Sequence, residues 1–139
     1  MTALRPSGAR DSTVPFFKGE LMSKASLIAQ ADKLFSSWFH EKYAICAIEG
    51  CNNPCELHHI IGRGNHLFRW SRLNAVPLCD WHHKYSKLLS AHASPESFFD
   101  WLSDNRPEEH YFWEHNRHTI GVSLTEDWYR QKIKELQLW

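Results

Sequence analysis

The chain has 139 residues, about the length of one domain, and 42% of them are hydrophobic and 14% aromatic, which excludes an intrinsically disordered protein. Sixteen Lys and Arg residues balance sixteen Asp and Glu residues, so a strong overall attraction to nucleic acid is excluded, although local charged patches are not. No apolar run reaches the roughly 18 to 20 residues of a membrane span, and the first residues lack the apolar core of a secretion signal. We therefore expect a cytoplasmic protein that does not enter membranes.

The first third of the chain predicts a lead-in followed by a helix. Residues 1–20 contain Pro and Gly without apolar periodicity, which indicates a flexible lead-in, and residues 21–139 are expected to form a single domain. From Leu21 to Tyr43, apolar residues recur at steps of three and four, as in an amphipathic helix that packs on the rest of the protein. These residues are Leu27, Ile28, Ala31, Leu34, Phe35, Trp38 and Phe39.

The middle of the chain predicts a hairpin and a helix. Glu56–Ile61 and Ala75–Leu78 are short apolar runs of strand length, and a polar loop that contains Gly62-Arg63-Gly64-Asn65 separates them. An antiparallel hairpin with a long loop is the natural interpretation. After Cys79, a stripe with helical spacing predicts a helix that follows the second strand. Its members are Trp81, Tyr85, Leu88 and His92.

The last part of the chain predicts three shorter helices. Each begins with a Pro at a first helical position or with acidic residues in the first turn, namely at Ser94-Pro95-Glu96, Pro107-Glu108-Glu109 and Thr125-Glu126-Asp127. The aromatic residues of this part either cover a small core over residues 46–90 or form the contact of a homodimer. They are Phe98, Phe99, Trp101, Tyr111, Phe112, Trp113, Trp128 and Trp139.

Four cysteines and ten histidines point to metal binding, because thiols in a reducing compartment are more readily metal ligands than disulfides. Cys46 and Cys51 form a close pair across a glycine turn, and Cys79 and His82 form a second pair at the start of the predicted helix. A hairpin would bring the two pairs together as a tetrahedral structural zinc site. Pairing of Cys51 with Cys55 is an alternative, and buried cysteines without a metal are another.

Two histidine doublets, His58-His59 and His82-His83, indicate a second metal site. Neighbours on a helix point about 100° apart, so His82 would face the cysteines while His83 would meet His58 or His59. In a regular strand the two residues of the first doublet point to opposite faces. Both can serve one site only if the strand ends or bulges there, and we predict such a distortion. Ordinary structural histidines are the alternative.

Three segments together resemble the HNH family of nucleases. They are Glu56-Leu57-His58-His59-Ile60-Ile61, then Asn74, then Leu78-Cys79-Asp80-Trp81-His82-His83. The family is named after a His, an Asn and a second His, which would be His59, Asn74 and His83 here. The resemblance covers about residues 46–90. It implies a small α+β protein with a ββα-metal core, stapled by zinc. His82 stands where such proteins often have Cys, an exchange that zinc tolerates.

The resemblance also implies roles for individual residues. His59 would be the general base, His58 and His83 would bind the catalytic divalent ion, and Asn74 would hold the base and the hairpin in place. A phage or mobile genetic element acting in a bacterial cytoplasm is the implied setting.

The chemistry of phosphodiester hydrolysis agrees with these roles. An imidazole whose pKa is near neutrality can take a proton from the attacking water, and a divalent ion neutralises charge on the phosphoryl and leaving oxygens. Mg²⁺ prefers oxygen ligands, whereas imidazole favours Mn²⁺, Ni²⁺ or Zn²⁺. We therefore expect a site that accepts several of these ions or prefers transition metals.

The charges are unevenly distributed along the chain. Residues 63–87 contain five basic residues and one acidic residue, a net charge of +4, whereas residues 96–127 have a net charge of −6. Arg63, on a glycine-flanked loop, is the preferred phosphate contact, followed by Arg69 and Arg72. The alternative is that these arginines only solvate the loop. Phe68 and Trp70 are expected to anchor the loop or the core.

The sequence thus predicts a metal-dependent endonuclease that binds and cuts DNA, with a structural Zn²⁺ and a catalytic divalent ion. One alternative is a zinc-stapled nucleic-acid-binding module without activity, which would not need His59. Another is a protein-interaction domain that uses the acidic aromatic tail. A two-fold homodimer is the simplest route to double-strand breaks.

Overall fold

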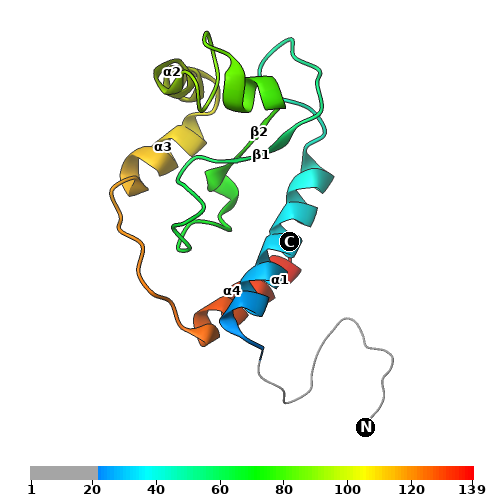
Figure 1. Cartoon of the computed structure of the whole chain (residues 1–139), viewed down its shortest axis with the longest axis vertical. Helices are drawn as coiled ribbons and strands as arrows, with labels where there is room; N and C mark the ends of the chain where they lie inside the picture. The colour runs from blue at the N-terminus through cyan, green and yellow to red at the C-terminus, as the bar shows by residue number, and fades with distance from the viewer. Residues whose placement is uncertain (1–21) are drawn as a thin grey trace.

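The computed structural model describes residues 22–139, and it combines helices with one small sheet (Figure 1). The sheet has two antiparallel strands, so the described part is of the mixed α+β class that the sequence predicts. The predicted lead-in over residues 1–20 lies outside the described residues. None of the helices between residues 22 and 139 combines the length and the apolar character needed to cross a lipid bilayer.

The long first helix, α1, spans Lys24–Lys42, as the apolar period predicts. The hydroxyl of Ser23 caps it by accepting a hydrogen bond of 3.1 Å from the amide of Ser26. One side of the helix is buried, through a row of residues four apart. The row consists of Leu27, Ala31, Phe35 and Phe39.

Strands β1 (Glu56–His59) and β2 (Ala75–Leu78) form the predicted hairpin, with His58 opposite Val76 and His59 opposite Ala75. The first strand is two residues shorter than predicted. It ends at His59 because the amide of Ile61 donates to the side chain of Asn74 at 2.6 Å and not to a strand partner. The strand thus ends at the doublet, but the two histidines do not share a site as the predicted distortion requires, since His59 is not among the histidines that group with His58.

The prediction of a helix after Cys79 is wrong beyond the first turn. A short π-helical segment, η3, spans Trp81–Tyr85, and the exposed fraction of Leu88 is 87%, so the expected stripe does not face the core. The hydroxyl of Ser86 accepts hydrogen bonds from the amides of Leu88 and Leu89, which competes with continued helix. The chain then folds back on η3.

The three tail helices are confirmed as α2 (Pro95–Asn105), α3 (Pro107–Asn116) and α4 (Glu126–Gln137). Figure 1 shows α2 and α3 on one side of the hairpin and α4 alongside α1, with an extended segment, residues 117–125, between the two groups.

Two clusters of buried side chains support this arrangement. The first joins α1, α4 and the hairpin loop, where Trp70 is 1% exposed and its indole N–H donates to Asp32 at 2.8 Å. Trp70 therefore anchors the loop, as predicted. The second cluster packs Phe98 and Leu102 of α2 on β2 and on two cysteines. Part of the aromatic tail thus covers the small sheet, while Tyr111 stays 63% exposed.

Candidate functional site

The predicted zinc ligands converge on one point. One ligand atom from each of Cys46, Cys51, Cys79 and His82 lies within 4.8 Å of all the others. The Sγ atoms of Cys51 and Cys79 are 3.8 Å apart, and Nδ1 of His82 lies 3.6 Å from Sγ of Cys46 and 3.3 Å from Sγ of Cys79. Zn–S and Zn–N bonds of about 2.3 and 2.1 Å in a tetrahedron give ligand separations of about 3.8 and 3.6 Å. The four residues therefore fit a structural zinc ion.

The turns around this cluster explain how the ligands meet. The amide of Cys46 donates to the carbonyl of Asn53, and Gly50 adopts a positive φ of 83°, so the segment doubles back and returns Cys51 toward Cys46. The amide of His82 donates to Sγ of Cys79 at 3.4 Å, which orients that sulfur at the start of η3.

Burial and hydrogen bonds shift the pKa values of the ligand side chains in different directions. Burial raises the pKa of Cys46 to about 11. Burial also raises the pKa of Cys79, but hydrogen bonds from the His82 amide and from the thiols of Cys51 and Cys46 outweigh it and lower this pKa below its usual value. Burial lowers the pKa of His82, which keeps its imidazole neutral, as a zinc ligand must be.

Cys55, the alternative partner of Cys51, lies outside this group. Its Sγ contacts the carbonyl oxygen of Tyr43 at 3.7 Å, and it packs at the edge of the first core cluster. The structure thus selects Cys46 and leaves Cys55 as a packing residue.

A second cluster contains only histidines. Ring nitrogens of His58, His83 and His92 lie within 4.8 Å of one another. Burial is the main cause that lowers the pKa of His58 to about 3, and the charges of His83 and His92 add to this effect. Burial likewise lowers the pKa of His92. Three imidazoles at this spacing could hold one divalent ion.

The sequence prediction missed His92 as a candidate ligand and placed it only in the helical stripe after Cys79. On a continuous helix, nine residues would separate it from His83 by about 13.5 Å. The chain folds back instead, and the amide of His92 donates to the carbonyl of His83 at 2.9 Å. No pattern of spacing indicates this turn, although the serine-rich stretch after Tyr85 is a sign that the helix ends.

Glu56 supports the histidine cluster from the first position of β1. Its Oε1 lies 2.5 Å from Nδ1 of His83, and this hydrogen bond is the main cause that lowers the pKa of the carboxyl group. Because the carboxylate accepts the proton of Nδ1, the Nε2 atom of His83 keeps its lone pair for a metal ion. The sequence prediction did not include Glu56 among the site residues.

His59 points away from this cluster. Its ring stacks on Phe35 at a centroid distance of 6.1 Å, and its Nε2 lies 2.9 Å from the carbonyl oxygen of Arg69. A carbonyl can only accept, so Nε2 carries the proton and Nδ1 carries the lone pair. Burial is the main cause that lowers the pKa of His59. The side chains of the first doublet thus keep the opposite faces of a regular strand, although the strand ends at this point.

Asn74 closes the hairpin loop from inside. It is fully buried, its Oδ1 accepts from the amide of Ile61, and its Nδ2 donates to the carbonyls of Ile61 and Phe68 at 3.0 Å each. These three bonds fix both ends of the loop next to Arg69, the residue whose carbonyl orients His59.

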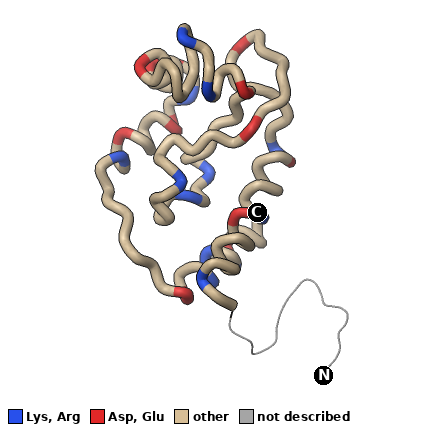
Figure 2. Tube along the Cα trace, viewed as in Figure 1, with Lys and Arg blue, Asp and Glu red and all other residues tan. Residues whose placement is uncertain are grey.

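The three predicted DNA-binding arginines differ in their surroundings. Arg63 is 65% exposed and lies 3.5 Å from Asp32. Arg69 is 11% exposed and binds both carboxylate oxygens of Asp32, and the guanidinium of Arg72 lies 4.1 Å from the ring centre of Trp139. Figure 2 shows basic residues gathered on the hairpin loop. Arg69 is thus committed to Asp32, whereas Arg63 and Arg72 belong to exposed positions from which a side chain can reach a phosphate.

The chain matches no family model, and no curated protein or solved structure matches it.

Proposed function

We propose that this chain is a metal-dependent DNA endonuclease of the HNH type, with β1, β2 and η3 as its ββα-metal core. The observation that carries the proposal is the convergence of His58, His83 and His92 beside the strand end that bears His59. The three imidazoles could together hold a divalent ion and leave other positions of that ion open to phosphate and water.

The histidines have different roles in the proposed hydrolysis. A divalent ion bound by the three histidines supplies charge stabilisation for the phosphoryl and leaving oxygens. His59, at the end of β1 and on the face opposite the three histidines, would accept the proton of the attacking water at Nδ1, since Nε2 is bonded to the carbonyl of Arg69. Its lowered pKa keeps the imidazole neutral, and therefore able to accept a proton, at cellular pH.

Other residues position these groups and the substrate. Asn74 holds the hairpin loop, Glu56 orients His83, and Arg63 contacts a phosphate of the DNA. The cluster around Cys79 holds a structural Zn²⁺ that supports the same hairpin and segment η3.

The test is cleavage of supercoiled plasmid by the zinc-loaded protein in Mg²⁺, Mn²⁺, Ni²⁺ or Zn²⁺. We expect His59→Ala to lose at least about a hundredfold in rate while keeping its zinc and its circular dichroism spectrum. The matched control is His118→Ala, because His118 is exposed and belongs to neither cluster.

The outcomes separate the candidate functions. Equal cleavage rates for His59→Ala and the wild type would show that His59 is not the general base. DNA binding without cleavage in any of the ions would favour a nucleic-acid-binding module instead. Full cleavage with Mg²⁺ and none with Mn²⁺ or Ni²⁺ would contradict the histidine ligands, because imidazole favours the transition metals.

A further inference from the structure

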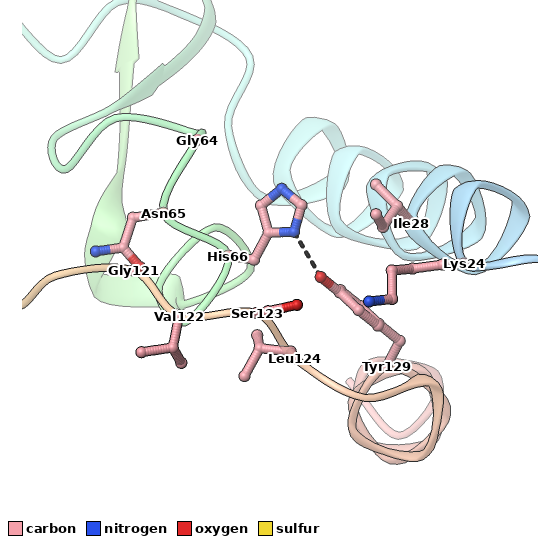
Figure 3. Close-up of a pocket in the computed structure, with 10 residues that line it drawn as sticks. All are labelled: Lys24, Ile28, Gly64, Asn65, His66, Gly121, Val122, Ser123, Leu124 and Tyr129. Carbon is pink, nitrogen blue, oxygen red and sulfur yellow. Dashed lines mark hydrogen bonds between the residues drawn. The ribbon is translucent and has the colours of Figure 1, made fainter.

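An open cavity of about 560 Å³ is bordered by α1, the hairpin loop, the extended segment before α4 and Tyr129 of α4 (Figure 3). Its floor and one side are apolar, formed by Ile28, Val122 and Leu124. Binding sites for small molecules have volumes of about 300 to 1,000 Å³, so this cavity has room for one nucleotide.

Hydrogen bonds hold the walls of the cavity together. Nδ1 of His66 lies 2.7 Å from the hydroxyl of Tyr129, as Figure 3 shows, so the loop is joined to α4. Nδ2 of Asn65 donates to the carbonyl of Thr119 at 3.0 Å, which joins the loop to the extended segment. The cavity is therefore a built feature of three elements that are far apart in the chain.

The charge of the lining favours an anion. Lys24 is the ionised side chain among the described residues that line the cavity, and none of these lining residues is acidic. Lys24 therefore offers a phosphate a basic group with no carboxylate in the lining against it. The exposed Arg63 precedes Gly64 of the lining in the sequence, and its guanidinium lies 3.5 Å from Asp32, which is not part of the lining.

A short chain of contacts joins this cavity to the proposed general base. Nε2 of His66 lies 3.3 Å from Nη1 of Arg69, and the carbonyl of Arg69 accepts the hydrogen bond of His59. Arg69 thus contacts both a residue of the cavity lining and the proposed general base.

We propose that the cavity receives one unpaired nucleotide of the strand being cut, with its phosphate at Lys24 and its base against Val122 and Leu124. This inference rests on the proposed nuclease function and names its substrate class. A base in a duplex is stacked and paired, so it enters such a cavity only from a single-stranded or unpaired region or after flipping. The preferred substrate is then DNA with unpaired nucleotides next to the scissile bond.

The experiment measures binding of the full chain carrying His59→Ala, which prevents cleavage, to two labelled DNAs of the same sequence. One is fully paired and the other contains a short unpaired bubble. Val122→Glu places a negative charge in the cavity, and Ile120→Glu is its matched control. Both residues are exposed, by 60% and 82%, and they stand two positions apart on the same segment, but Ile120 does not line the cavity.

We expect Val122→Glu to weaken binding of the bubble DNA about tenfold and binding of the paired DNA less than twofold, as loss of a single stacked nucleotide would. Ile120→Glu is expected to change neither. In a second pair, Lys24→Gln is expected to lower the salt dependence of bubble binding by about one ion, and Lys33→Gln, on the same helix outside the cavity, is not.

The results distinguish a failure of the proposed nucleotide site from a failure of the proposed nuclease function. Cleavage by the otherwise wild-type chain together with equal bubble binding by the two glutamate variants would overturn the nucleotide site and leave the nuclease. Selective loss of bubble binding in a protein that cuts no DNA would keep the nucleotide site and overturn the nuclease. If Val122→Glu, and not Ile120→Glu, weakened binding of both DNAs equally, the added charge would act generally, and this result would overturn the inference.

Discussion

The two Cys and His clusters share a short helical segment but differ in their donors. On η3, His82 joins three thiols while its neighbour His83 joins two imidazoles. Three thiols and an imidazole complete a tetrahedron around zinc and leave no position for a substrate. Three imidazoles supply no negative charge and leave positions open. Under the proposed function, one short segment of chain would carry both a closed zinc site that supports the fold and an open site for the catalytic ion.

The largest expected effect separates the two clusters by stability. Cys79→Ser removes a ligand from the closed cluster, and we expect it to lower the free energy of unfolding by about 5 kcal/mol and Tm by about 20 °C, since binding of a structural zinc contributes directly to folding. Thermal unfolding and zinc content measure this change.

Cys55→Ser is the matched control for Cys79→Ser, because Cys55 lies outside the cluster. It is expected to keep one zinc per chain and to lose about 1 kcal/mol or less. Loss of zinc in the Cys55 variant as well as in the Cys79 variant would restore the alternative pairing of Cys55 with Cys51, because Cys79 is a ligand in both pairings.

A smaller effect concerns the open cluster. His92→Ala is expected to weaken Ni²⁺ or Mn²⁺ binding at the second site about a hundredfold while the structural zinc and Tm stay close to the wild type, since one of three ligands is lost. Titration calorimetry on the zinc-loaded protein measures the affinity. His118→Ala serves as the exposed control, and an unchanged affinity in the His92 variant would mean that His92 only packs against the other two rings.

The smallest effect concerns the support of the open cluster. Glu56→Gln keeps the shape of the side chain but removes the carboxylate that accepts from His83, so metal affinity or cleavage is expected to fall about tenfold. Glu108→Gln, on α3, is the control. Equal metal affinity and equal cleavage in Glu56→Gln and Glu108→Gln would show that Glu56 does not position His83.

Most of the local structure could be predicted from the sequence, because it depends on nearby residues. The helix α1 follows from its apolar period, and the three tail helices follow from Pro and acidic residues at their starts. The helix after Cys79 could not be predicted in the same way. Its stripe has helical spacing, but Ser86 offers its hydroxyl to the backbone and the chain turns back.

The candidate site was predictable only in part, for the same reason. The cysteine and histidine pairs indicate two metal sites by their spacing, but three decisions depend on contacts between distant residues. The turn around Gly50 selects Cys46 over Cys55, the fold-back after η3 brings in His92, and the carbonyl of Arg69 decides which nitrogen of His59 is free.

The amino-acid sequence by itself determined which donors exist and which short elements carry them, because ligand chemistry and helix propensity are properties of neighbouring residues. Tertiary structure alone decided which of those donors share a centre, and it created the cavity beneath Val122 from three separate elements. Contacts between residues that are far apart in the sequence depend on how the whole chain packs, and spacing along the sequence does not encode them directly.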